Sequence, residues 1–322
     1  MSLAIVMYHY VRDLKKSKYP IIIGLELDLF REQIDYLRKN YSIVRMEDVL
    51  ASFEGNGDLP RNAALLTFDD GYTDHYYNVM PYLKKHGLQG SFYIPSSCVL
   101  ENKVLDVNKI HILLASIERT EDVVKEILAF VEKEKEHYGF EYDKGIYEDF
   151  SNVGYHKDTK DTKFIKQALQ VRLPVELRKD ILNHLMNDYL VLNEEEVSRE
   201  LYVSQDQISD MANSGMHIGS HSHNHSWLGH MSKVDQKDEL IKSKSFLEQL
   251  DINENQYTIC YPYGSYNEET IDLASSLGFK LGLSAKVGIA DNPKEAMFLP
   301  RLDTNDLPKD RCANTDLWLN KA

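Results

Sequence analysis

Two adjacent carboxylates, Asp69 and Asp70, follow an apolar run at residues 63–68, and Gly71 comes next. The run is typical of a buried strand that carries both aspartates to its C-terminal end. Neighbouring strand residues point to opposite sides, so both carboxylates can face one site only if the chain turns there, which Gly71 permits. One carboxylate could then bind a metal while the other accepts a proton from water. A simple turn after a strand is the alternative interpretation.

A second candidate group, His221 and His225, lies far downstream in the sequence SHSHNH and follows a short predicted strand. Their spacing of four predicts two imidazoles on one face of a helical turn, where they could bind one ion. A polar loop with solvated histidines is the alternative. With Asp70, the two histidines make three protein ligands, the usual number for a catalytic divalent site that keeps a position open for water.

Alternating strands and helices must position these groups. We predict strands at residues 4–8, 41–44, 63–68, 90–94, 216–219, 257–261, 279–283 and 297–302. Helices are predicted at residues 46–53, 76–86, 205–214, 234–250 and 268–277, and Asp28 is predicted to cap another. This alternation favours a parallel sheet or barrel.

Between residues 101 and 201 the alternation fails, and apolar residues such as Val124, Ile127 and Val131 recur at helical spacing. Residues 138–161 are polar and predict a loop. We therefore predict a barrel formed by residues 1–100 and 202–322, and a helical insertion at 101–201 that flanks the active-site groove.

Composition excludes several classes of partner. The 322 residues carry a formal net charge of −14, which disfavours nucleic acids and anionic membranes, and no run of about 18 apolar residues predicts a membrane span. The three cysteines are sparse, which indicates a reducing compartment, and the first residues lack the pattern of a signal peptide. We expect a cytoplasmic protein; the alternative is an exported protein whose signal peptide is absent from this sequence.

The motifs TFDDGY, SHSHNH and YPYG, in this order and each after a short predicted strand, resemble those of the polysaccharide deacetylase family, carbohydrate esterase family four. The resemblance implies an α/β fold, a distorted (β/α) barrel of seven or so strands, with its groove at the strand C-terminal ends. It implies that Asp70, His221 and His225 bind a divalent metal, zinc in the first place. It also implies that Asp69 is the catalytic base and that Tyr263 contributes a backbone N–H to the oxyanion hole.

The sequence departs from the family pattern twice. Cys260 stands where the family has the arginine that orients the base, and Arg301 in LPRLD is the candidate replacement, unless it pairs with a surface carboxylate. The L-x-L-H motif that supplies the general acid is missing. His9, after the first strand, resembles the histidine of a variant branch that includes deacetylases of poly-N-acetylglucosamine. The alternative for His9 is a histidine bonded to loop backbone.

The remaining candidates have weaker signals. His217 is predicted to pack in the core, and His223 to lie in the loop facing away from the metal. His230 could line the groove or face solvent. Trp227 could pack beneath the ligands or form a platform for a sugar ring.

These observations predict a metal-dependent hydrolase that removes the N-acetyl group from an N-acetylated saccharide, either a surface-glycan precursor or a polysaccharide. The alternatives are a catalytically inactive carbohydrate-binding barrel, and a deformylase or deacetylase of another N-acylated sugar. Asp69 beside a complete ligand set favours an enzyme, because sugar binding needs no proton acceptor there.

Overall fold

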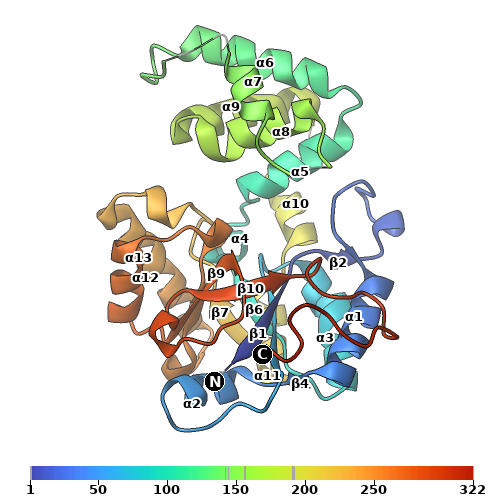
Figure 1. The fold of residues 1–322 in the computed structure, drawn as a ribbon. Helices are drawn as coiled ribbons and strands as arrows, with labels where there is room; N and C mark the ends of the chain where they lie inside the picture. The colour runs from blue at the N-terminus through green and yellow to red at the C-terminus, as the bar shows by residue number, and fades with distance from the viewer. Residues whose placement is uncertain (1, 142, 144, 156, 191–192, 322) are drawn as a thin grey trace. The chain divides into compact units, whose positions relative to one another are not determined.

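The computed structural model describes residues 2–321 except 142, 144, 156, 191 and 192 (Figure 1). The chain divides into two compact units. The first comprises residues 1–15, 23–103 and 198–322, and the second comprises residues 16–22 and 104–197.

The first unit contains a closed parallel sheet. Its strands are β1 (Leu3–Tyr8), β4 (Ser42–Ile43), β5 (Ala63–Phe68), β6 (Ser91–Ile94), β7 (His217–Ser220), β8 (Thr258–Cys260), β9 (Leu281–Val287) and β10 (Leu299–Asp303). They pair in the order β1-β10-β9-β8-β7-β6-β5-β4, and β1 pairs again with β5. Seven strands therefore form the ring, and β4 pairs with the start of β5 outside it. The predicted distorted (β/α) barrel is confirmed.

Alternate residues of β5 face two different cores. Leu66 packs in a cluster that also contains residues of the surrounding helices, whereas Leu65 packs with residues of β1, β6, β8, β9 and β10. The second cluster is shared by strands from around the ring, so it fills the barrel interior. Because strand side chains alternate, Thr67 and then Asp69 continue the interior row. The backbone N–H of Asp69 still donates to the Tyr8 carbonyl of β1 (2.9 Å), which extends the strand pairing as far as the carboxylate.

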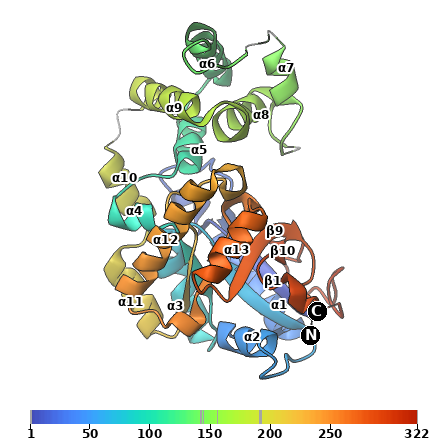
Figure 2. The same cartoon turned by 90° about the vertical axis from the view of Figure 1, so that its left-hand side faces the viewer.

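Helices surround the barrel, as Figure 2 shows for α11, α12 and α13. They are α1 (Leu27–Asn40), α2 (Met46–Phe53), α3 (Met80–Lys85), α4 (Ser96–Leu100), α11 (Gln205–Asn213), α12 (Lys233–Gln249) and α13 (Glu268–Ser276). Short helical turns are η1 (Leu14–Lys16), η2 (His75–Val79), η4 (Leu228–His230), η5 (Glu254–Gln256), η6 (Pro262–Gly264) and η7 (Pro293–Glu295). A small second sheet pairs β2 (Val11–Arg12) with β3 (Leu25–Glu26).

Helix α1 corrects one prediction. Its cap is Glu26, the last residue of β3, and Asp28 lies in the first turn instead of capping the helix. The strand runs directly into the helix, so the helix begins one residue before Asp28. A carboxylate in the first turn still interacts favourably with the positive end of the helix dipole.

The second unit is helical and has a hydrophobic core of its own. Its helices are α5 (Asp106–Ser116), α6 (Thr120–Glu134), α7 (Ile146–Ser151), α8 (Lys160–Gln167), η3 (Ala168–Arg172) and α9 (Val175–Tyr189), followed by α10 (Glu194–Leu201), which leads back to the barrel. The stripe residues Val124, Ile127 and Val131 are buried in this core. Helix α7 falls inside the segment predicted as a loop, because Ile146 and Phe150 pack into the same core.

None of the helices in the described ranges is both long and apolar enough to cross a membrane.

Candidate metal and catalytic site

A left-handed turn after β5 presents Asp70. Both Asp70 (φ 74°) and Gly71 (φ 64°) have positive φ, so the chain reverses directly after Asp69. The Tyr72 hydroxyl donates a hydrogen bond to Asp70 Oδ2 (2.7 Å) and fixes the carboxylate plane. Asp70 Oδ1 is buried and has no hydrogen-bond partner among the described residues, although most buried polar atoms have one.

Two imidazoles face this oxygen. His221 Nε2 lies 3.4 Å from Asp70 Oδ1, and His225 Nε2 lies 3.2 Å from it. The predicted helical turn between the histidines is wrong, because residues 221–225 form a loop in which Ser222 (φ 57°) and His225 (φ 56°) adopt left-handed backbone conformations. These two positions fold the loop back on itself, so that His225 returns to the strand end where His221 begins.

The three side chains fit a divalent metal. Their ligand atoms lie within 4.8 Å of one another and all three residues are buried. Ligands at ~2.0–2.1 Å from a tetrahedral ion are separated by about 3.3 Å, which agrees with the observed spacings. His221 Nδ1 donates to the Cys260 carbonyl (2.7 Å), so the lone pair is on Nε2, toward Asp70. The orphaned Asp70 Oδ1 is therefore explained if these residues hold a metal.

Asp69 lies beside this group and is gripped by Arg301. The guanidinium binds both carboxylate oxygens, with Nη1 2.9 Å from Oδ1 and Nη2 2.7 Å from Oδ2. Arg301 is itself fixed by hydrogen bonds to the Ser284 carbonyl (2.7 Å) and the Thr67 hydroxyl (3.3 Å). Burial opposes ionisation of Asp69, but the charge and the hydrogen bonds of Arg301 outweigh it and lower the pKa of the carboxyl to about 2.

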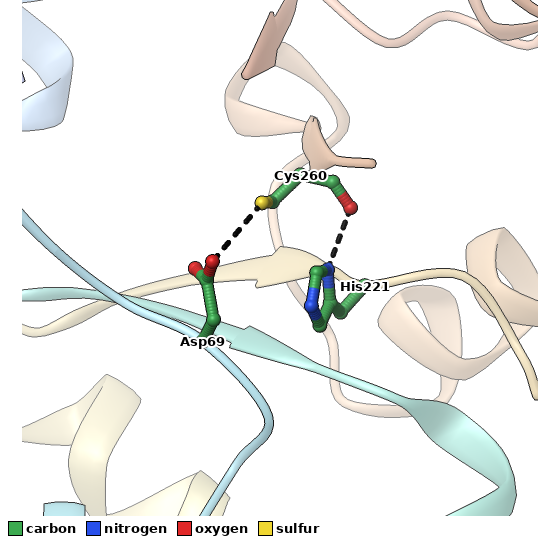
Figure 3. Close-up of side chains that lie close together, drawn as sticks. All are labelled: Asp69, His221 and Cys260. Atoms are coloured by element: carbon green, nitrogen blue, oxygen red, sulfur yellow. Dashed lines mark hydrogen bonds between the residues drawn. The ribbon is translucent and has the colours of Figure 1, made fainter. Parts of the chain in front are cut away.

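Cys260 connects Asp69 with His221, one of the candidate metal ligands (Figure 3). Its thiol donates to Asp69 Oδ2 at 3.4 Å, and its carbonyl accepts from His221 Nδ1. Burial raises the pKa of the thiol, so it stays protonated as a donor. Asp69, His221 and Cys260 could form a second metal group. Asp69 is already held by Arg301 and His221 Nδ1 is already bonded, so this group fits a metal less well.

His9 lies at the rim of the barrel, directly after β1. Its side chain is 43% exposed, and its Nε2 lies 3.9 Å from Asp69 Oδ2. The backbone carbonyl of His9 accepts a hydrogen bond from Nε2 of the buried His75 (2.9 Å). The structure thus fixes the His9 backbone while leaving its imidazole accessible beside Asp69.

Tyr263 is brought to the same site by η6. Its φ of 58° is unusual for an aromatic residue and costs roughly 1–2 kcal/mol. The ring contacts His225 edge-on (centroids 4.6 Å apart) and stacks on Trp227 (4.3 Å, 6° between planes). Trp227 in turn stacks on His230. This aromatic column holds Tyr263 in its strained conformation next to His225, a candidate metal ligand.

Sequence reasoning missed several residues that hold the site. Glu239 of α12 accepts hydrogen bonds from the backbone N–H groups of His223 (3.1 Å) and Asn224 (2.8 Å), which anchors the histidine loop to a helix. No sequence signal connects Glu239 to that loop.

His217 is buried and its Nε2 bonds the Gln256 carbonyl (3.0 Å), consistent with a core histidine.

The family model described as polysaccharide deacetylase matches residues 56–135 and 182–282, more than half of the chain. The chain belongs to the polysaccharide deacetylase family. The two matched stretches contain Asp69, Asp70 and the histidine loop, and the gap between them falls within the second unit.

Curated relatives of this family member match over short regions. YxkH of Bacillus subtilis (strain 168), whose name assigns it to the polysaccharide deacetylases, is 27% identical over 106 residues, which are 33% of this chain and 38% of YxkH. The poly-β-1,6-N-acetyl-D-glucosamine N-deacetylase of Escherichia coli (strain K12) is 32% identical over 80 residues, 24% of this chain. That match spans only 12% of the Escherichia coli protein.

Solved structures of deacetylases share the fold over nearly the whole chain. The Streptococcus pyogenes deacetylase PplD, solved in complex with acetate, gives a TM-score of 0.59 at 18% identity and covers 96% of both chains. IcaB from Ammonifex degensii gives 0.55 at 17% identity, covering 94% of this chain and 91% of its own. At these identities the likeness establishes the fold alone.

Proposed function

We propose that this member of the polysaccharide deacetylase family is a metal-dependent hydrolase that removes the N-acetyl group from an N-acetylated saccharide. One observation carries the proposal: a buried carboxylate, Asp69, is kept ionised by Arg301 directly beside a complete Asp-His-His ligand set. A proton acceptor next to a metal site is what hydrolysis needs.

Asp70 Oδ1 and the Nε2 atoms of His221 and His225 would hold a divalent ion, with zinc favoured by this nitrogen and oxygen donor set. When bound, the ion supplies Lewis acidity, which makes a water more acidic and polarises the acyl oxygen. Tyr72 and the Cys260 carbonyl orient two of these ligands through their second polar atoms.

Asp69 is assigned as the base. With a pKa of about 2 it is ionised at neutral pH, but for the same reason it is a weak base. Asp69 can therefore take a proton only from a water whose pKa has been lowered. A metal held by the neighbouring ligand set would lower it. The bidentate Arg301 contact keeps the carboxylate oriented, so the direction of proton transfer is fixed before substrate binds.

Two further residues complete the proposed mechanism. The backbone N–H of Tyr263 would donate to the developing oxyanion, where one such donor is commonly worth about 3 kcal/mol. His9 would give a proton to the leaving amine nitrogen, since its accessible imidazole lies 3.9 Å from Asp69 Oδ2. The C–N bond then breaks, giving acetate and a free amine.

The saccharide is proposed to carry N-acetylglucosamine-type residues. The Escherichia coli relative, by its name, acts on poly-β-1,6-N-acetyl-D-glucosamine, and Tyr263 places an aromatic ring beside His225 of the ligand set. Aromatic rings of this kind bind the apolar faces of sugar rings.

The test is release of acetate from N-acetylated oligosaccharides and nucleotide sugars by protein loaded with zinc or cobalt, compared with Asp69→Asn. We expect release by the wild type and its loss in the variant. Metal and saccharide binding without acetate release would instead indicate an inactive carbohydrate-binding barrel, and release of formate from N-formylated sugars alone would identify a deformylase.

A further inference from the structure

The main segment of the second unit, residues 104–197, is joined to the barrel by two short junctions that belong to the barrel unit. We define the exit junction as residues 96–103 and the return junction as residues 198–203. We propose that Glu101 and Tyr202, one on each junction, are positioning residues for the metal ligands. This inference rests on the metal site of the proposed function.

The exit junction is bonded to the loop that carries both histidine ligands. The backbone N–H groups of Ser96 and Ser97 donate to the carbonyls of Ser222 (3.2 Å) and His223 (3.0 Å). These four backbone atoms align the start of α4 with the middle of the loop. Any displacement of the exit junction therefore acts on residues that directly follow His221.

His223 adds a side-chain connection on the same junction. Its buried imidazole bonds Ser96 Oγ through Nδ1 (2.8 Å) and Glu101 Oε1 through Nε2 (2.9 Å). A carboxylate can only accept, so Nε2 is the donor. His223 is neither exposed nor a metal ligand here, and its two bonds fix the loop between His221 and His225. Glu101 thus holds the histidine loop, and it lies close to residue 103, where the chain leaves the barrel unit.

The return junction is bonded to the other ligand-bearing segment. The Val203 N–H donates to the Gly71 carbonyl (2.9 Å), and the Thr73 hydroxyl donates to the Glu200 carbonyl (2.9 Å). Tyr202 and Tyr72 form an antiparallel bridge, and their rings are stacked with centroids 6.0 Å apart and planes 13° apart. Since the Tyr72 hydroxyl holds Asp70 Oδ2, Tyr202 packs against the residue that orients the third ligand.

The two junctions are also joined to each other. The Ser198 hydroxyl lies 3.2 Å from the carbonyls of both Cys98 and Lys103, so the return junction is tied to the exit junction where they pass. The two junctions therefore contact the segments that carry all three proposed ligands: the exit junction is bonded to the histidine loop, and the return junction packs on Tyr72, which bonds Asp70.

Metal affinity tests this assignment without relying on turnover. Cobalt binding is measured by titration and by the visible spectrum of the bound ion, with circular dichroism as a check of folding. Tyr72→Phe removes the bond to Asp70 while keeping the ring stack, and should weaken binding by about 10–100-fold. Tyr202→Leu and Glu101→Ala should weaken it by roughly threefold to tenfold, because each acts through one intermediate residue.

Matched controls separate positioning from general destabilisation. Tyr257→Leu removes a buried tyrosine ring packed on Phe279, and Glu248→Ala removes a half-exposed glutamate paired with Lys244. Both should leave cobalt affinity unchanged. Glu101→Gln should restore most of the affinity lost in Glu101→Ala, because the amide oxygen still accepts from His223 Nε2.

A double-mutant cycle decides the route. If Tyr202 acts through the Tyr72 hydroxyl, Tyr202→Leu should have no further effect on cobalt affinity in the Tyr72→Phe background. The same loss in both backgrounds, or unchanged affinity in folded Tyr202→Leu and Glu101→Ala, would overturn the inference alone. Absence of cobalt and zinc binding by the wild type would overturn the metal-dependent function, and the inference with it.

Discussion

At the scale of single residues, the site separates two adjacent aspartates into different roles. Asp69 continues the interior row of β5 and meets Arg301, whereas the left-handed turn rotates Asp70 toward the two imidazoles. One carboxylate is saturated by hydrogen bonds, and the other keeps an orphaned oxygen. This difference in environment, and not the residue type, suits one aspartate for proton transfer and the other for metal binding.

Asp69→Asn tests that division. The amide cannot accept the proton of water, so acetate release should fall by about 10²–10⁴-fold. Cobalt affinity should stay within a few-fold of the wild type, because Asp69 contributes no ligand atom to the Asp70, His221 and His225 group. Asp70→Asn is the matched control and should lose the metal. Equal loss of metal in both variants would show that Asp69 is a ligand.

His9→Ala tests the proposed acid. His9 is half-exposed, so the variant should fold and bind cobalt normally, while kcat falls by roughly 10²–10⁴-fold. Much of that loss should disappear with a substrate whose leaving group needs no proton. His86→Ala, which removes a histidine at the end of α3, should have no effect. A near-normal kcat with an unchanged pH profile would remove His9 from the mechanism and direct attention to His230 or water.

At the scale of elements, sequence periodicity predicted the barrel strands and their helices well, because buried parallel strands are nearly continuous apolar runs bounded by glycine and polar residues. It failed at the histidine loop, where a spacing of four was interpreted as helical. Left-handed backbone at Ser222 and His225 leaves no trace in the sequence, since neither residue is glycine. The contact of Asp69 with Arg301 was only a candidate, because it joins residues on strands far apart in the chain.

One element carries a stability prediction. Burial lowers the pKa of His75 to about 4, outweighing its bond to the His9 carbonyl and the charges of Asp70 and Asp69, which raise it. The unfolded chain, with an ordinary value of 6.5, therefore binds a proton first as pH falls. Stability from the neutral imidazole is complete above pH 6.5 and is lost between pH 6.5 and 4, by about 3 kcal/mol in all.

His75→Gln keeps a side-chain N–H that can donate to the His9 carbonyl but does not titrate. We expect its free energy of unfolding to fall less steeply than that of the wild type between pH 6.5 and 4, measured by urea denaturation at several pH values. His137→Gln changes an exposed histidine and should retain the wild-type slope. Parallel curves for wild type and His75→Gln would contradict the buried neutral state.

At the scale of the whole molecule, the barrel that carries the candidate site is combined with a helical unit that has its own core. The family model matches the stretches that contain Asp69, Asp70 and the histidine loop, and its unmatched gap, residues 136–181, falls within the helical unit. Fold does not by itself determine the substrate, which depends on the surfaces added to it. We propose that the second unit influences which saccharide is used, whereas the barrel residues carry out bond cleavage.

Replacement of residues 104–197 by a short glycine-serine linker tests this assignment. The junction residues 96–103 and 198–203 stay, because their hydrogen bonds support the metal ligands, so the variant should still bind cobalt. Activity on different N-acetylated saccharides should change in rank, with the largest loss for longer oligosaccharides, while a monosaccharide substrate keeps its kcat. A folded variant with unchanged selectivity would contradict the assignment. The oligomeric state of that variant in solution decides the alternative. If the wild type is an oligomer and the variant with unchanged selectivity is a monomer, the second unit serves assembly, because loss of an interface lowers the mass of the particle without altering which saccharide the barrel accepts.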